Sequence, residues 1–300
     1  MSTRLALNVY IDTDRGTREG VPNLVADCRE FGVPACFFFS FGPDQTGRAI
    51  ARSIQPGVLQ KIRRAGRVQT HGLRALLNGT LLPAPQIGRR NAHIMRAVRD
   101  AGFEVGIHSY NHHHWQTHLE RMSQPEVAAE FSAACLQFRR IFSAEPHAAG
   151  AAGWQSNAHS RAAYEQADLL YSSDTRGTHP YFPFVGEQGF STLEIPTTLP
   201  ALDELLGRPE FPSDLIVRHY LSLLRSEQLN VLAVHAEIEG LGRRELFRQL
   251  LGECQAAGVE FIRLDDFARE LLTNREAIPS HYQVMAEIKG RRGLVATQMV

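Results

Sequence analysis

Short apolar runs that end in polar residues recur along this chain and alternate with longer amphipathic stretches. Apolar runs of this kind predict buried strands, and stretches with apolar residues every three or four positions predict helices. The predicted strands cover residues 5–12, 34–40, 103–108, 168–173, 192–196, 230–235 and 259–264. The predicted helices cover residues 18–31, 91–101, 124–142, 212–226 and 243–257. Gly32 and Gly258 follow two of these helices, where glycine commonly ends a helix.

Strands and helices that alternate in this way imply parallel strands joined by right-handed crossovers. About seven such units predict an α/β barrel, in which reactive side chains follow the carboxyl ends of strands. The chain places Asp12 and Asp14 after its first predicted strand, and His108, Asp174 and His235 at the ends of later strands. We therefore expect these five side chains to face one mouth of the barrel.

Two segments do not fit the repeating pattern. Residues 42–90 are long for one connection and mix cations with apolar residues between Arg52 and Arg67. That mixture is typical of a helix that lies on a membrane surface, or of a solvated helix on a barrel. The last residues, 274–300, carry few helical signals. We expect one barrel over residues 1–273, with an insertion at about 42–90, and a tail of residues 274–300 packed on it.

The composition excludes several classes of protein. Lys and Arg together number 32, as do Asp and Glu, so the formal net charge is zero and nucleic-acid binding is not expected. No apolar run approaches the length that crosses a bilayer, and the first residues do not resemble a secretory leader. The four cysteines show no Cys-x-x-Cys spacing, so we expect reduced, buried thiols and a cytoplasmic protein.

Two histidines four residues apart form the first candidate site. The motif His108-Ser-Tyr-Asn-His112 brings two imidazoles to one side of a helical turn. Zinc-type sites combine such a pair with a carboxylate and leave positions open for water and substrate, and Asp12 is the natural third ligand. This ligand set suits zinc, cobalt, manganese, iron or nickel. Because His113 and His114 extend the run, a solvated polar loop is the alternative interpretation.

A metal ion held in this way polarises a carbonyl and activates water, so the ligand set indicates hydrolysis. Hydrolysis of an amide also requires an acceptor for the proton of water and a donor for the leaving amine. His235, at the end of a strand expected to face the same mouth, is the candidate donor. The alternative is a core histidine bonded to the backbone.

Several segments of the chain resemble the polysaccharide deacetylases of the NodB-homology type. Asp12-Thr, followed by Arg15-Gly-Thr-Arg-Glu-Gly-Val-Pro22, resembles their first motif, and His108-Ser-Tyr-Asn-His112 resembles their second. A closer similarity is to the branch that deformylates 4-deoxy-4-formamido-arabinose linked to undecaprenyl phosphate. Further similar segments, spread over nearly the whole chain, include Ala151-Ala-Gly-Trp154, Ser173-Asp-Thr-Arg-Gly177, His235-Ala-Glu-Ile-Glu-Gly240 and Ile288-Lys-Gly-Arg-Arg-Gly293.

The resemblance implies a distorted (β/α)7-type barrel and a metal-dependent amide hydrolase that removes an N-formyl or N-acetyl group from an amino sugar. The substrate would be lipid-linked or belong to a natural-product pathway, and a lipid-linked substrate would add peripheral contact with the inner membrane. One divalent ion would be bound, with zinc as the first expectation. The site residues that the resemblance implies are Asp12, His108 and His112 as metal ligands, His235 as general acid, and Trp154, Asp174, Arg176 and Glu237 around the substrate.

Trp154 and Arg176 also have interpretations from their chemistry alone. An indole ring can stack on a sugar face, and a guanidinium can bind a phosphate or carboxylate through two hydrogen bonds. Core packing and a structural salt bridge, respectively, are the alternatives.

The chain departs from the family at one catalytic position. The first motif of the family carries two carboxylates, of which the first is the general base and the second binds metal. In an alignment without gaps the base position is Tyr10, whose ordinary pKa near 10 makes it a poor proton acceptor. In a gapped alignment Asp12 is the base and Asp14 is the ligand. We favour the ungapped alignment because Thr13 and the spacing after it match.

Three outcomes of this departure are open. Asp14 could replace the missing base. Alternatively His235, Glu237 or Glu239 could serve both proton transfers. The third outcome is a catalytically altered or silent protein that binds a glycan or runs a different reaction in a biosynthetic pathway. Asn111, where the closer branch has an aspartate, adds weight to this third outcome.

Overall fold

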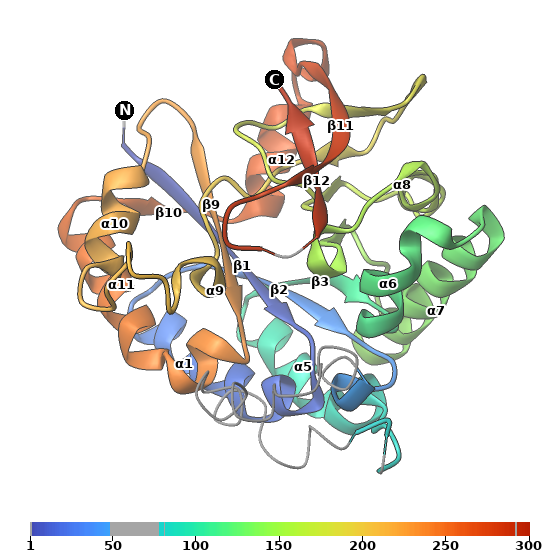
Figure 1. Ribbon diagram of the computed structural model, residues 1–300, viewed down its shortest axis with the longest axis horizontal. Coiled ribbons are helices and arrows are strands. Elements are labelled where there is room, and N and C mark those ends of the chain that lie inside the picture. Colours follow the sequence, from blue (N-terminus) through green and yellow to red (C-terminus); the bar gives the residue numbers. More distant parts are fainter. Residues whose placement is uncertain (1, 49–77, 81, 292) are drawn as a thin grey trace.

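A curled parallel sheet forms the centre of the molecule (Figure 1). The computed structural model describes residues 2–48, 78–80, 82–291 and 293–300. In this part of the chain the sheet has the order β10-β1-β2-β3-β4-β5-β8, with β9 also paired to β1, and every pair is parallel. The strands are β1 (Arg4–Ile11), β2 (Cys36–Ser40), β3 (Glu104–Ser109), β4 (Ala148–Ala149), β5 (Tyr171–Ser172), β8 (Leu193–Glu194), β9 (Leu229–His235) and β10 (Glu260–Phe261).

Helices surround this sheet on its outer side (Figure 1). The longer ones are α1 (Val21–Glu30), α5 (Ile87–Asp100), α7 (Gln124–Phe142), α8 (Ala158–Gln166), α10 (Ile216–Leu223), α11 (Arg244–Ala256) and α12 (Leu264–Leu272). Helix α7 begins where the backbone N and Oγ of Ser123 both donate to the Glu126 carboxylate, at 2.8 and 2.7 Å. Gly32 and Gly258 follow α1 and α11 with φ angles of +64° and +72°, which favour glycine. The five predicted helices and the distorted (β/α)7-type barrel are confirmed.

Successive residues of β1 face two different parts of the core. Leu7 and Val9 pack in the layer between the sheet and the helices, whereas Ala6 and Tyr10 pack inside the barrel. This alternation is what a strand buried on both faces requires. Tyr10 pairs in register with His235 of β9, so both side chains point into the barrel. Asp12 follows on the same face, just beyond the end of the strand.

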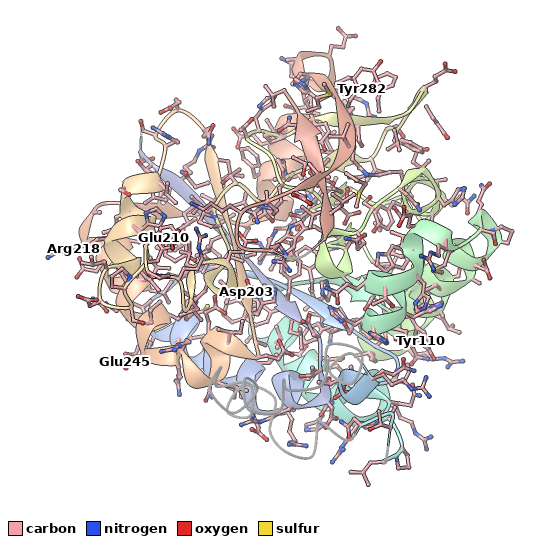
Figure 2. The ribbon with its side chains drawn as sticks, in the orientation of Figure 1. Tyr110, Asp203, Glu210, Arg218, Glu245 and Tyr282 are labelled. Atoms are coloured by element: carbon pink, nitrogen blue, oxygen red, sulfur yellow. The ribbon has the colours of Figure 1, made fainter. Side chains whose placement is uncertain are left out.

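A second, smaller sheet lies beside the barrel. It has the order β12-β11-β6-β7 and comprises β6 (Phe182–Val185), β7 (Gln188–Gly189), β11 (Ser280–Glu287) and β12 (Leu294–Met299). The tail therefore forms an antiparallel hairpin, with Tyr282 near its outer end (Figure 2). The buried Arg161 joins the two sheets, because its Nη1 lies 2.7 Å from Glu194 Oε2 and its Nε lies 2.9 Å from Gln283 Oε1. None of these four strands was among the predicted elements.

Part of the long insertion lies outside the described residues. Residues 49–77 include the predicted Arg52–Arg67 stretch, so its place on a membrane or on the barrel stays a prediction. The four cysteines are buried and free, as predicted. Among the helices within the described ranges, none is long and apolar enough to cross a bilayer.

Candidate metal centre and active site

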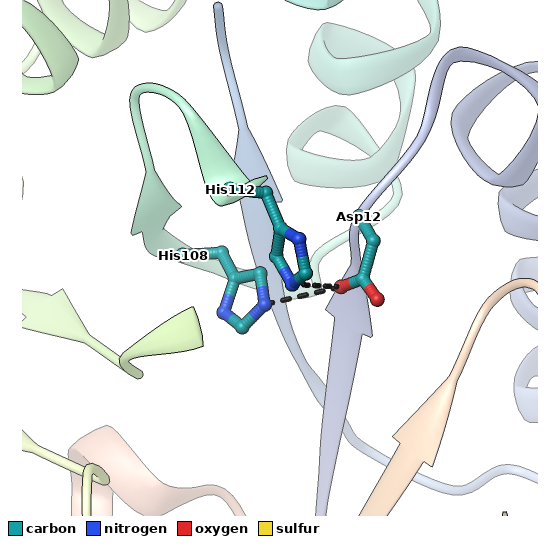
Figure 3. A group of neighbouring side chains, drawn as sticks. All are labelled: Asp12, His108 and His112. Atoms are coloured by element: carbon teal, nitrogen blue, oxygen red, sulfur yellow. Dashed lines mark ion pairs between the residues drawn. The ribbon is translucent and has the colours of Figure 1, made fainter. Parts of the chain in front are cut away.

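Three side chains meet where strands β1 and β3 end (Figure 3). Asp12 directly follows β1, His108 lies in β3, and His112 is the first residue of helix α6 (His112–His118). Asp12 Oδ1 lies 3.1 Å from His108 Nε2 and 3.4 Å from His112 Nε2. One ligand atom of each residue lies within 4.8 Å of the other two. The structure thus brings together the three residues that were predicted as metal ligands.

Two contacts from the protein orient the histidines. His108 Nδ1 lies 2.5 Å from the carbonyl oxygen of Gly150, and only a protonated Nδ1 can donate to that oxygen. The lone pair of the ring is therefore on Nε2, which faces Asp12. Asn111 caps helix α6, because its Oδ1 accepts a hydrogen bond of 3.1 Å from the backbone N of His114. The cap fixes the helical turn that presents His112.

The three ligand atoms suit a divalent metal ion. Asp12 Oδ1 is buried and, within the described residues, accepts no hydrogen bond, an arrangement that a bound cation would stabilise. Burial lowers the pKa of His112 to about 4, so its imidazole is neutral at pH 7. Burial alone would raise the pKa of Asp12, but His112 and His108 bring it well below its usual range. Neutral imidazoles and an ionised carboxylate are the forms that bind metal.

The buried side chain of Tyr10 lies inside the barrel, beside His108. This side chain is 2% exposed, and its ring centroid lies 4.9 Å from that of His108 and 5.9 Å from those of His235 and Trp154. The hydroxyl donates to the carbonyl oxygen of Ser173 at 3.1 Å. Burial raises the pKa of Tyr10 well above its usual value, so the phenol keeps its proton. In this arrangement Tyr10 has no capacity to accept a proton from water at neutral pH.

Asp14 belongs to a network of ion pairs close in sequence to Asp12. Its Oδ1 accepts a hydrogen bond of 3.0 Å from Asn91 Nδ2. Its Oδ2 lies 3.2 Å from Nη1 of Arg18 and 3.3 Å from Nη1 of Arg90. Both carboxylate oxygens therefore have partners, and Asp14 is not a member of the group of ligand atoms found around Asp12.

Glu237 holds the backbone that carries Asp12. Its Oε1 accepts hydrogen bonds from the backbone N of Asp12 at 3.1 Å, and from the backbone N and Oγ1 of Thr13 at 3.0 and 2.8 Å. Gly16 leaves room for this carboxylate, because a Cβ there would lie 1.9 Å from Glu237 Oε1. Burial, together with the charge of Asp12, raises the pKa of Glu237 to about 8. Glu237 thus fixes the position of Asp12 within the group of three predicted metal ligands.

His235 is the last residue of β9, the strand that pairs with β1. Its Nδ1 is buried and forms no hydrogen bond within the described part of the chain. Its backbone N donates to Glu239 Oε2 at 2.9 Å, and burial raises the pKa of Glu239 to about 8. The backbone of His235 is therefore fixed, while its ring nitrogen Nδ1 has no hydrogen-bond partner among the described residues.

Asp174 is fully buried behind the loop that follows β4. Its Oδ1 accepts a hydrogen bond of 2.7 Å from the backbone N of Ala151. Burial raises the pKa of Asp174 to about 6. Asp174 therefore holds in place the loop that leads to Trp154.

Trp154 and Arg176 are both engaged by the protein. Trp154 is 3% exposed, and its Nε1 lies 3.2 Å from Thr197 Oγ1. Arg176 donates to the carbonyl oxygens of Thr197 and Leu199, at 3.4 and 2.9 Å, and to Glu204 Oε1 at 2.6 Å. In this structure Trp154 packs as a core residue, and Arg176 forms a structural salt bridge.

Two features of the site were not predicted. One is the carbonyl oxygen of Gly150, which sets the tautomer of His108. The other is Arg291, whose Cζ lies 4.2 Å from the centroid of the Trp154 ring. The only sequence signal for it was the Ile288–Gly293 segment, which carried the family resemblance without a role.

Comparison with known proteins agrees with this geometry. Residues 6–172 match the model of the family named polysaccharide deacetylase. The chain is 32% identical to a protein of Shewanella sediminis named "probable 4-deoxy-4-formamido-L-arabinose-phosphoundecaprenol deformylase", over 99% of this chain and 95% of that protein. It is 31% identical to the protein of the same name from Wigglesworthia glossinidia brevipalpis, over 94% of this chain and 98% of that one.

A likeness in fold extends to a solved structure. The structure comes from Mycobacterium smegmatis, is assigned as a polysaccharide deacetylase, and matches with a TM-score of 0.65 at 16% identity over 96% of each chain. At that identity the match supports the barrel fold alone. The family model and the two relatives decide the classification: the chain belongs to the polysaccharide deacetylase family.

Proposed function

We propose that this protein is a metal-dependent amide hydrolase that removes an N-formyl or N-acetyl group from an amino sugar carried on a lipid phosphate. The observation that carries the proposal is the cluster of Asp12, His108 and His112, with a buried Asp12 oxygen that accepts no hydrogen bond within the described residues. The names of the two relatives supply the substrate class, a formamido-arabinose joined through phosphate to undecaprenol.

Asp12, His108 and His112 would hold the metal ion, with zinc as the first expectation. A bound divalent ion would polarise the acyl carbonyl and lower the pKa of a water molecule. The contribution of the protein is to hold the ligands in place. Gly150 fixes the ring of His108, and Glu237 fixes the backbone of Asp12. Such supporting contacts typically change metal affinity about 10- to 100-fold.

His235 is the residue that we assign to both proton transfers. Hydrolysis requires an acceptor for a proton of water and a donor for the leaving nitrogen. Tyr10 donates its hydroxyl to Ser173, and both oxygens of Asp14 have partners. His235 Nδ1, by contrast, makes no hydrogen bond with any described residue, and Glu239 holds its backbone. A ring that first accepts and then donates a proton can serve in place of a separate carboxylate.

A lipid-linked substrate also bears on the location of the protein. The substrate named for the relatives is anchored in a membrane by its undecaprenol chain. We therefore propose that the protein is cytoplasmic and makes peripheral contact with the inner membrane.

A second candidate function is binding without turnover. The observation that favours it is Tyr10 in the position where the family has a general base, since a buried phenol that keeps its proton cannot take that role. In this alternative the barrel recognises the acylated sugar, and the metal cluster serves binding or stability.

Metal-dependent turnover is the direct test of these two functions. The protein is stripped with a chelator, reloaded separately with zinc, cobalt, manganese, iron or nickel, and incubated with 4-formamido and 4-acetamido arabinose phosphates. We expect release of formate or acetate, measured by chromatography, only in the reloaded samples. Binding of both compounds by calorimetry with no product under any metal would favour the second function. A protein that takes up no metal and binds neither compound would contradict both.

Replacement of Tyr10 tests the assignment of the proton transfers. Tyr10→Phe keeps the ring and loses one hydrogen bond, so we expect kcat within about threefold of wild type and a loss of about 1 kcal/mol in the free energy of unfolding. Tyr10→Asp empties the space of the ring and buries a carboxylate, so we expect a loss of about 3–5 kcal/mol. Urea unfolding and steady-state kinetics measure both effects.

Two kinetic results would overturn that assignment. If folded Tyr10→Phe lost activity by about a hundredfold, the hydroxyl would take part in proton transfer. If Tyr10→Asp were more active than wild type, the wild-type site would lack a base that a carboxylate at position 10 supplies, and His235 would be an incomplete substitute for it.

A further inference from the structure

The loop between β11 and β12 reaches from the tail to the active site. Gln155 Nε2 donates to the carbonyl oxygen of Leu294 at 2.7 Å, which ties the start of β12 to the loop of Trp154. Arg291 in the same loop places its Cζ 4.2 Å from the centroid of the Trp154 ring. Toward the active site, the centroid of the Trp154 ring lies 6.2 Å from the centroid of the His235 ring. Arg291 is therefore one aromatic ring away from a reacting group.

Arg176 and Arg291 both contact Trp154, but their guanidinium groups differ in how many nitrogens already have a protein partner. All three nitrogens of Arg176 donate to protein oxygens. In Arg291 only Nη1 has partners within the described residues: Glu204 Oε1 at 3.2 Å and Asp203 Oδ2 at 3.7 Å. Its Nε and Nη2 form the edge of a guanidinium that binds a phosphate through two parallel hydrogen bonds.

The loop between β11 and β12 packs closely against the backbone of Glu204. Gly290 has a φ angle of +98°, and a Cβ at this position would lie 2.6 Å from the backbone oxygen of Glu204. The adjacent Arg291 side chain is 14% exposed and is held by the face of Trp154 and by Glu204. A guanidinium held in this way loses little conformational entropy when it binds an anion.

The charges around Arg291 leave room for an anion. The buried carboxylate of Glu204 is shared between Arg176 and Arg291. Among the described residues, Arg291 also pairs with Asp203, which is 40% exposed and whose Oδ2 lies 3.7 Å from Nη1 of Arg291. Lys289 is 79% exposed, and its Nζ lies 3.8 Å from Glu210 Oε1. Exposed ion pairs of this kind are weak and rearrange at little cost.

We propose that Arg291 binds the phosphate of a glycosyl-phosphate substrate and selects for it over the neutral sugar. The inference rests on the proposed function. In a 4-acylamino pentose 1-phosphate, the amide is attached to C4 and the phosphate to C1, at opposite ends of the sugar ring. When the acyl group lies between the three predicted metal ligands and His235, the phosphate therefore lies about one ring width from the acyl group. Trp154 spans that separation between His235 and Arg291.

Selectivity between two matched substrates tests this inference. The substrates are the methyl phosphodiester of 4-formamido-arabinose and its methyl glycoside, which lacks the phosphate. We expect Arg291→Ala to lower the ratio of kcat/KM for the diester to that for the glycoside about 10- to 100-fold, mainly through KM. We expect Arg291→Lys to lower it about threefold, because a lysine keeps the charge without the paired donors.

Arg275→Ala is the matched control. Arg275 also lies over an aromatic ring, with its Cζ 4.3 Å from the centroid of Phe182, and donates to the carbonyl oxygen of Ser191 at 2.6 Å. We expect its selectivity ratio to equal that of wild type. An unchanged ratio in Arg291→Ala would overturn the inference. An equal loss of kcat/KM for both substrates would also overturn it, and would make Arg291 a support for Trp154 only.

Binding separates a failure of this inference from a failure of the proposed function. If the wild type hydrolyses neither substrate, the proposed function fails, and the same diester is titrated by calorimetry into wild type, Arg291→Ala and Arg275→Ala. Weaker binding to Arg291→Ala alone would still support a phosphate site at Arg291. Equal binding by all three proteins, or binding by none, would overturn it.

Discussion

The variant His108→Ala is expected to lose the metal ion and to lower kcat for amide hydrolysis about a thousandfold or more. His108 contributes Nε2, with its lone pair directed at the ion site by the hydrogen bond from Nδ1 to Gly150. Without it, Asp12 and His112 remain as two ligands, and a hydrolytic site normally has three from the protein. Metal content after dialysis, measured by mass spectrometry, and kcat at saturating substrate check this result together.

A histidine of helix α6, the helix that begins with His112, supplies the control. His114 is 43% exposed and lies outside the group of three ligand atoms, so His114→Ala removes an imidazole from the helix that carries His112 without changing any of the three ligands. We expect it to retain its metal. If His108→Ala bound metal as tightly as His114→Ala does, the ligand set proposed for this protein would be wrong.

The sequence predicted seven of the eight strands of the central sheet, because the longer strands are buried on both faces; it missed β4, which is only two residues long. Residues of β1 such as Leu7 and Tyr10 face different layers, yet both are apolar in character and lie in one continuous run. Parallel strands also bring their carboxyl ends to one mouth of a barrel. This rule alone is enough to group Asp12 with His108, although the two residues lie 96 positions apart in the sequence.

The second sheet could not be predicted in the same way. In β11, Gln283 is buried while Tyr282 and Met285 are largely exposed. A buried polar residue between exposed apolar ones reverses the pattern that predicts a strand. Gln283 is buried because it accepts hydrogen bonds from Arg161, which lies 122 positions earlier. Such a pairing depends on the tertiary fold and leaves no local signal.

The roles of the charged residues in the site were underdetermined for a related reason. Asp14 and Arg176 have the chemistry of a base and of a phosphate ligand, respectively. Their availability depends on partners far along the chain: Asn91 lies 77 positions from Asp14, and Glu204 lies 28 positions from Arg176. The sequence identified which residues could react, whereas only the fold decides which of them keep a free oxygen or nitrogen.

The variant His235→Ala is expected to lower kcat about 10²- to 10⁴-fold while the protein keeps its full metal content. The reason is that His235 is the assigned proton carrier, but it is not one of the three ligand residues. Its ring lies against Tyr10, with centroids 5.9 Å apart, so the loss also leaves a small cavity that urea unfolding will register. Metal analysis and kcat together separate this variant from His108→Ala, which should lose both.

His219→Ala is the matched control, because His219 packs against Phe211 with ring centroids 4.6 Å apart and belongs to α10, which contributes no residue to the cluster. We expect its kcat to match wild type. A His235→Ala protein that is folded, metal-loaded and nearly as active as this control would show that another group carries the proton. Glu237 would then be the next residue to replace, because its Oε2 is buried and, in the described residues, forms no hydrogen bond. The comparison therefore decides whether His235 carries the proton in a site where Tyr10 keeps its own proton.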